Sequence, residues 1–315
     1  MDIKGFLLLF KDAGQAYLRD RATIFAAGLA YYAVFSIAPL IILITGIAGL
    51  FAGRTTAGEL IFMQLQSIVG PELARFIEQV VRSFADQATS RTAAVVSLVV
   101  LLFSAGGIFN QLKTAINYLW GLTSVRPGTA AEWVLAARRR AIPFLMVFGF
   151  GVLFGMALLI ETVLLAVSTR LEVFLPSVSA LLPQLTVLLI PTLSFITFLI
   201  IFKLLPDAES RWRDMAVGAL VATLLFSVGR RLLVVVLTYS NTGSIFGAAG
   251  SIVVLLIWVY FSAQILLFGA EFAWLYAERF GRPIRPNPTA DFATSAGSRD
   301  DAAKPITKEN LELKK

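Results

Sequence analysis

The sequence contains neither cysteine nor histidine. Without cysteine the chain forms no disulfide bond and offers no thiol nucleophile. Without histidine it lacks the commonest metal ligand and the side chain that most often acts as a general base near neutral pH. These absences argue against thiol and metal-dependent catalysis, and we expect no enzyme activity, no cofactor and no metal site.

Charged residues are also scarce. Only 15% of the 315 residues are charged and 57% are hydrophobic, with a mean hydropathy of +0.79. Soluble domains have about 25% charged and 45–50% apolar residues. Uncharged apolar runs of about 18 residues or more recur, and each is long enough to cross roughly 30 Å of hydrocarbon. Because these runs are continuous rather than alternating, we expect an all-α, polytopic membrane protein.

The apolar runs predict a six-helix membrane domain over 29–281. An amphipathic segment over 1–28 precedes it, and a polar tail over 282–315, rich in Pro, Ala and Ser, is predicted to be disordered and cytoplasmic. Pro39 and Pro191 are candidate kinks within spans. The predicted spans cover about 29–52, 93–116, 141–167, 184–205, 215–238 and 250–277.

The distribution of basic residues predicts the orientation. With the N-terminus inside, 20 of the 27 Lys and Arg residues lie in cytoplasmic segments and five in outer ones. Cytoplasmic loops carry this excess in membrane proteins, so both termini are predicted to be cytoplasmic. The same bias accounts for the net charge of +7 without a nucleic-acid partner. We therefore expect a multi-pass membrane protein whose partners are membrane lipids.

Two segments outside the spans have helical apolar spacing. The first, near the N-terminus, predicts an amphipathic helix that lies on the membrane surface and presents Ile3, Phe6, Leu7, Phe10 and Tyr17. The second lies in the long outer loop between spans one and two, after Pro71. Helices there could cap the bundle, lie on the outer leaflet or meet a partner chain.

Charged residues inside spans are the first candidates for a functional site, because a charge in the membrane is costly. Arg230 and Arg231 lie in the middle of the apolar run of span five, and Glu161 lies at a similar depth in span three. We predict that Glu161 pairs with one of the arginines. Adjacent helical residues point about 100° apart, so the other arginine reaches toward the outer surface or faces a cavity. An anionic headgroup or substrate is the alternative ligand.

Other polar residues of the spans form a secondary set, for which hydrogen bonding between helices is the simplest explanation. Glu271 lies near the inner end of span six, where Lys113, Lys203 or Arg279 could neutralise its charge. Several glycines, among them the group in NTGSIFGAAG, permit close helix packing or a broken helix. The secondary candidates are Asn110, Gln111, Lys113, Gln264 and Glu271.

Four stretches together resemble the YihY/virulence factor BrkB family of bacterial inner-membrane proteins. They are AAGLAYYAVFSIAPLIILI, KTAINYLWG, KLLPDAESRWRDMAVGALVATLLF and NTGSIFGAAGSIVVLLIWVYFSAQILLFGAEF, in this order between residues 26 and 272. The resemblance implies a six-helix membrane protein without an agreed biochemical activity, and many members carry the label ribonuclease BN. That label does not suit this chain, because zinc-dependent ribonucleases need a cluster of His and Asp ligands.

Two functions remain open. The first is a transporter or flippase for a lipid, an amphiphile or another envelope-related solute, supported by charged residues within the spans, candidate kinks and a Gly-rich outer turn. The second is a scaffold, without transport activity, that organises envelope or virulence-related machinery. The sequence has no nucleotide-binding loop, so transport would be passive, ion-coupled or powered by a partner. Substrate and oligomeric state are not predicted by the sequence.

Overall fold

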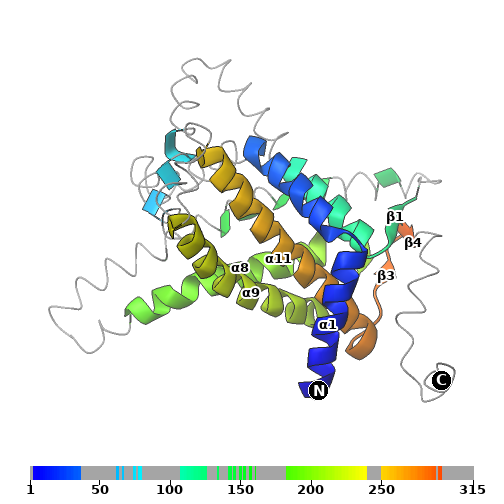
Figure 1. Cartoon of the computed structure of the whole chain (residues 1–315). Coiled ribbons are helices and arrows are strands. Elements are labelled where there is room, and N and C mark those ends of the chain that lie inside the picture. Colours follow the sequence, from blue (N-terminus) through cyan, green and yellow to red (C-terminus); the bar gives the residue numbers. More distant parts are fainter. Residues whose placement is uncertain are drawn as a thin grey trace.

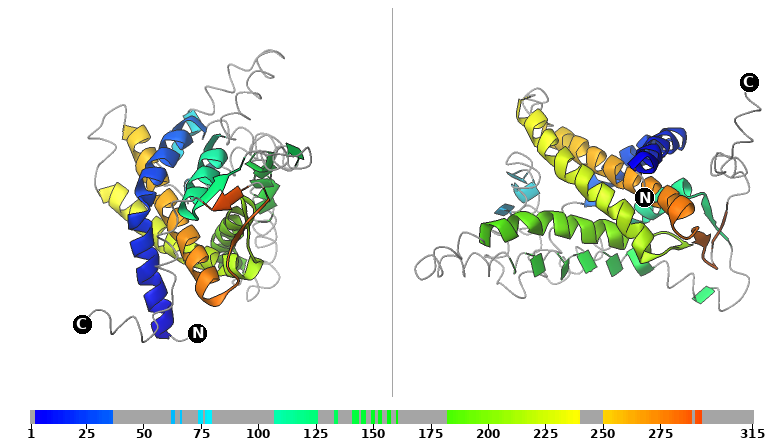
Figure 2. Two further views of the ribbon diagram at one scale, coloured as in Figure 1. Left: turned by 90° about the vertical axis from the view of Figure 1, so that its right-hand side faces the viewer. Right: turned by 90° about the horizontal axis from the view of Figure 1, so that it is seen from below.

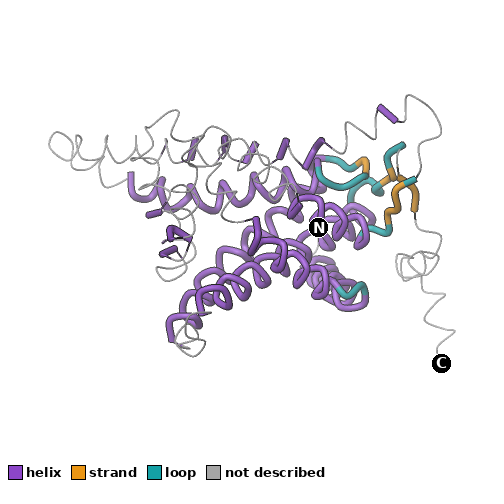
Figure 3. Tube along the Cα trace, turned by 90° about the horizontal axis from the view of Figure 1, so that it is seen from above, coloured by secondary structure: helices purple, strands orange, loops and turns teal. Residues whose placement is uncertain are grey.

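The protein is described by a computed structural model, and its described residues are almost all helical. They comprise 3–36, 107–125, 182–239, 250–288 and 290–292, together with separate helical residues between 62 and 79 and between 133 and 160. The long helices cross one another, and four short strands gather at one end of them (Figures 1 and 3).

Among the described residues, two helices are long and apolar enough to cross a bilayer, α9 (Trp212–Tyr239) and α11 (Gly250–Phe280). Within each, only 33% of the most apolar stretch is buried by the rest of the chain. The exposed apolar side chains recur about every fourth residue along α9, as expected of a helix face in contact with lipid. They are Leu220, Leu224, Val228, Leu232, Val235 and Val236.

The last three predicted spans agree closely with observed helices. Span four corresponds to α8 (Leu182–Leu204), which contains Pro191, while spans five and six correspond to α9 and α11. The helix over 107–119 includes the inner end of span two. Most residues of spans one, two and three lie outside the described part of the chain, including Pro39.

Helices α9 and α11 pack antiparallel at a very short distance (Figure 2). A Cβ atom added at Gly218 of α9 would lie 2.4 Å from the Cβ of Ala273 and 2.8 Å from the carbonyl oxygen of Gly269, both in α11. A Cβ at Gly269 would lie 2.6 Å from that of Ala222. Each helix therefore presents a small residue every fourth position, the spacing that lets two membrane helices approach closely.

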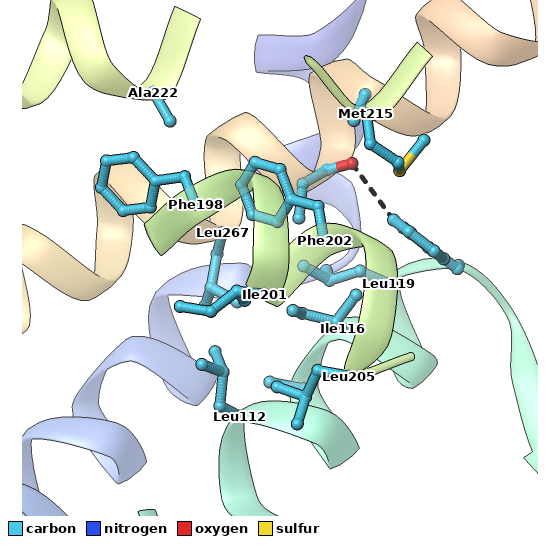
Figure 4. Close-up of a cluster of buried hydrophobic side chains, with 14 of the residues drawn as sticks. Leu112, Ile116, Leu119, Phe198, Ile201, Phe202, Leu205, Met215, Ala222 and Leu267 are labelled. Atoms are coloured by element: carbon cyan, nitrogen blue, oxygen red, sulfur yellow. Dashed lines mark hydrogen bonds between the residues drawn. The ribbon is translucent and has the colours of Figure 1, made fainter. Parts of the chain in front are cut away.

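The hydrophobic core lies where the helix over 107–119 meets α8, α9 and α11 (Figure 4). Trp120, only 1% exposed, donates from its indole nitrogen to the carbonyl oxygen of Ala270 in α11 at 3.1 Å. This bond satisfies a buried donor and joins the two helices. The labelled core side chains include Leu112, Ile116, Leu119, Phe198, Ile201, Phe202, Leu205, Met215, Ala222 and Leu267.

The predicted N-terminal helix is present, and one of its faces packs on another helix of the protein. Helix α1 (Ile3–Arg19) packs on α11, with the rings of Phe6 and Phe272 5.5 Å apart. Its Asp12 forms an ion pair with Arg279 at 2.6 Å. The next helix begins at residue 22, because the chain turns at Arg21, which has a φ of 50°. Helix α1 therefore ends before residue 28, and the point at which the first span enters the membrane stays a prediction.

The predicted disordered tail begins too early. Residues 282–288 and 290–292 are folded against the connections between helices, where β3 (Arg285–Pro286) pairs with β2 (Ala208–Glu209), and β4 (Ala290–Phe292) pairs with β1 (Leu122–Ser124). The Pro-rich composition suggested disorder, but backbone pairing with β1 and β2 holds the segment. The rest of the tail lies outside the described residues.

The outer-loop helix is described only in part. Ala74 and Ile77 are helical and buried, whereas Arg75 is exposed, which agrees with the predicted amphipathic spacing after Pro71. What this helix contacts in the cell stays a prediction.

The close crossing of α9 and α11 is tested by Gly218→Ala. The added methyl group overlaps Ala273 and the Gly269 backbone, so we expect a loss of about 1–3 kcal/mol in unfolding free energy. Thermal unfolding in detergent micelles measures the change. Gly14→Ala in α1 is the matched control, because nothing lies within 4 Å of its Cβ position. Equal stabilities of the two variants would contradict the close packing.

Candidate functional site

A buried polar cluster joins the connection between α8 and α9 to the helix over 107–119. Lys113 and Asn117 are four residues apart and share one face of that helix. The ammonium of Lys113 lies 2.9 Å from one carboxylate oxygen of Asp207. The Asn117 amide donates to the other oxygen at 2.9 Å and accepts from the backbone N–H of Asp207 at 2.9 Å. The carboxylate is thereby both neutralised and hydrogen-bonded.

The C-terminal segment adds to the same cluster. The backbone N–H of Asn287 donates to the carbonyl oxygen of Asp207 at 3.2 Å, and Asn287 is 1% exposed. The N–H of Ala290 in turn donates to the carbonyl oxygen of Asn287 at 2.9 Å. These bonds lie between the two strand pairs at the edge of the helices. The cluster therefore connects three segments that are far apart in the sequence.

The chemistry of this cluster is that of a structural clamp. Its single carboxylate is held by a lysine and an asparagine, and the two opposite charges cancel. Within the described ranges no three carboxylates gather as a metal-ligand set. We therefore assign the cluster the role of fixing the ends of the helices relative to one another.

Arg230 lies on the interior face of α9. It is partly buried, one turn from Phe226 and from Leu233, which is 8% exposed. The ring of Phe226 packs edge-on against Phe198 of α8 at 5.9 Å and against Trp258 of α11 at 6.1 Å. The side chain of Arg230 therefore starts on the face of α9 that turns toward its neighbouring helices.

Arg231 lies on an exposed side of α9, about 100° around the helix from Arg230. It shares that side with Val228 and Val235, which are 61% and 52% exposed. The two arginines thus occupy different environments, as the rotation of about 100° between adjacent helical residues predicts. Since α9 ends at Tyr239, they lie roughly 12–14 Å from that end of the helix.

Glu161, the predicted partner of these arginines, lies outside the described residues, so the pairing stays a prediction. Glu271 is 1% exposed in the interior of α11. Two of the cations proposed for it have ion-pair partners elsewhere, namely Asp207 for Lys113 and Asp12 for Arg279.

The other secondary candidates are scattered. Asn110 is exposed, and its backbone oxygen accepts a bond from Thr114 at 3.0 Å. The Gln111 amide lies against Gly28 of the helix over 22–36, 3.3 Å from where a Cβ would be. Gln264 is partly buried in α11. Among the secondary candidates, Lys113 belongs to the polar cluster through its ion pair with Asp207.

Sequence reasoning missed Asn117, Asp207 and Asn287, because all three lie at or beyond the ends of predicted spans. One local signal existed, since Lys113 and Asn117 are one helical turn apart. Their shared partner follows Pro206 about ninety residues later, and no periodicity connects the two segments.

The clamp predicts that Asp207→Asn is strongly destabilising. The change leaves the mostly buried Lys113 without its counter-charge, a loss that costs about 3–5 kcal/mol for buried pairs. Denaturation in detergent measures it, with the exposed Asp291→Asn as control, expected within about 0.5 kcal/mol of the parent protein. The double variant Lys113→Met/Asp207→Asn should regain part of the loss. Equal stability of Asp207→Asn and the control Asp291→Asn would rule out the clamp.

Comparison with known proteins agrees with the resemblance found in the sequence. The family described as "Virulence factor BrkB" matches residues 13–293, so its limit falls just after β4. A UPF0761 membrane protein of Aeromonas salmonicida is 27% identical over 270 residues, which cover 81% of this chain and 84% of that protein. The UPF0761 membrane protein YihY of Salmonella typhimurium is 28% identical over 215 residues, 67% of each chain. No solved structure matches. Because the match spans most of its length, the chain belongs to the virulence factor BrkB family of membrane proteins.

Proposed function

We propose that this protein transports or flips a lipid, an amphiphile or another envelope-related solute across the inner membrane. The observation that carries the proposal is Arg230, a cation on the interior face of a membrane-length helix. An arginine near the centre of a span costs about 2.5–3.5 kcal/mol on the insertion scale. Interior charges of this kind commonly line the paths of substrates and ions.

The guanidinium group suits an anionic substrate group. Arginine stays protonated and presents a planar set of donors that matches a phosphate or carboxylate. In the proposed mechanism, Arg230 holds the anionic group of the substrate within the bundle, and Arg231 meets it from the lipid-exposed side of α9. The proposed activity is movement of a molecule rather than covalent chemistry, and we do not assign ribonuclease activity.

Glu161 is the proposed counter-charge of this site in its unloaded state. Spans three and five are both predicted to end on the outer side, which gives Glu161 and the two arginines similar depths. An anionic substrate would replace the Glu161 carboxylate as the partner of Arg230. Exchange of one anion for another keeps the arginine compensated throughout.

The proposed topology has six spans and both termini in the cytoplasm. The chain has no cysteine, so single cysteines can be introduced and labelled individually. In spheroplasts, a membrane-impermeant maleimide should label Met63→Cys in the outer loop but not Gln15→Cys in α1. Both parent side chains are exposed in the folded chain. Both cysteines should react after lysis. Labelling of Gln15→Cys before lysis would contradict the orientation.

Transport is tested in liposomes that contain the purified protein and fluorescent phospholipid analogues. A hydrogen bond to a charged group contributes about 1.5–3 kcal/mol, so Arg230→Gln should slow lipid movement about tenfold or more. The matched control is Arg19→Gln, an exposed arginine that pairs with the adjacent Asp20. If Glu161 and Arg230 pair, the single variant Arg230→Glu should fold poorly. The charge swap Glu161→Arg/Arg230→Glu should then restore folding to that of the parent protein. Absence of movement of any analogue by the parent protein would favour the scaffold.

A further inference from the structure

The start of α9 and the end of α11 lie side by side. A Cβ added at Gly281 would lie 2.5 Å from the carboxyl carbon of Asp214, and the N–H of Arg282 donates to that carboxylate at 3.2 Å. The apolar stretches of these two helices begin at Trp212 and end at Phe280. These two aromatic side chains are 51% and 49% exposed. Both helices therefore reach the same membrane surface with a half-exposed aromatic ring.

Exposed arginines surround these two rings. Arg211 and Arg213 flank Trp212, and Arg282 and Arg285 follow Phe280. The β2–β3 pairing sets Arg285 opposite Glu209, which brings the two arginine pairs to one place. We call Arg211, Trp212, Arg213, Phe280, Arg282 and Arg285 the arginine rim.

The acidic residues near the rim leave it positively charged. Asp214 is buried and accepts from the Arg282 backbone, while Glu278 accepts from the N–H of Ile284 at 3.1 Å. Glu209 is exposed beside the rim. Two of the three carboxylates accept from backbone donors and are less exposed than Glu209. Four exposed guanidinium groups against three carboxylates leave a net positive charge.

Lys203, near the end of α8, contacts one residue next to the arginine rim and one within it. Its ammonium donates to the carbonyl oxygen of Ser210 and lies 5.8 Å from the centre of the Trp212 ring. A cation near the ring face favours a fixed indole orientation. The rim is therefore carried by a folded connection, with the indole held where the apolar part of α9 begins.

We propose that the arginine rim binds the phosphate group of an anionic phospholipid in the leaflet on this side of the membrane. A Trp ring at the end of a span lies at headgroup level, where the nearest abundant phosphate belongs to a lipid. Trp212 occupies this position at the start of α9, beside the end of α11 at Phe280. Guanidinium groups bind phosphate with two parallel hydrogen bonds. Clustered basic residues next to a membrane attract anionic lipids. This binding does not depend on the proposed transport activity.

The test compares lipid binding by the purified full chain in mixed micelles. Native mass spectrometry counts bound phosphatidylglycerol against phosphatidylcholine at equal mole fraction. The variant Arg211→Gln/Arg213→Gln/Arg282→Gln/Arg285→Gln should reduce the preference for phosphatidylglycerol about tenfold or more. Added glycerol phosphate should not displace the bound lipid, because the surface recognises a phosphate attached to acyl chains beside the apolar helices rather than free phosphate.

A control variant removes the same number of charges elsewhere, by changing Lys304, Lys308, Lys314 and Lys315 to Gln. It should keep the preference. Equal losses in both variants would overturn the proposal, because net charge would then explain the binding. If the fourfold variant does not fold, the two double variants, one on each segment, should each show part of the loss. Arg19→Gln, an exposed arginine outside both the rim and the proposed transport site, should retain the preference. If the fourfold variant loses the preference but still moves lipid in liposomes, the rim proposal stands independently of the transport proposal.

Discussion

The close contact between Gly218 and Gly269 is the interaction on which the rest of the structure depends. With no Cβ on either residue, α9 and α11 approach until backbone and methyl groups touch. In a membrane the hydrophobic effect does not drive helices together, so contact of this kind supplies much of the attraction. It also sets the level at which the start of α9 meets the end of α11. From there the chain enters the strand pairs and the polar clamp.

The clamp supplies partners for polar backbone groups at the ends of the membrane helices. Connections between spans expose backbone donors and acceptors, and these need partners wherever they are buried. Asp207 provides a carboxylate and two backbone groups, and Lys113, Asn117 and the Asn287 backbone pair with them. The segment over 282–292 therefore belongs to the folded domain, in agreement with a family match that extends to residue 293.

The two adjacent arginines show how helix geometry separates identical side chains. One residue of rotation directs Arg230 inward and leaves Arg231 on the side that also exposes Val228 and Val235. An inward arginine is compensated by other polar groups, whereas an outward one can extend toward the headgroups. Together with Arg211 and Arg213 at the start of α9, these two arginines place cations both at one end of the helix and within its apolar stretch.

The sequence predicted the helices well because apolar length is a local property. Spans four, five and six agree with α8, α9 and α11 to within three residues at each end. The four sequence blocks were also enough to identify the family. The folded part of the tail could not be predicted, because residues 282–292 look disordered until their strand partners are known.

For the candidate site too, some features could be predicted from the sequence and others depended on the tertiary structure. The sequence by itself determined that Arg230 and Arg231 lie within a span and face different directions, since charge and helical rotation are read along one segment. Only the tertiary structure decided that Phe226, one turn before Arg230, packs against α8 and α11, and that Lys113 pairs with Asp207. The physical reason is that these outcomes depend on which surfaces meet when helices pack. Small residues such as Gly218 and Gly269 govern that meeting, and their partners lie far away in the chain.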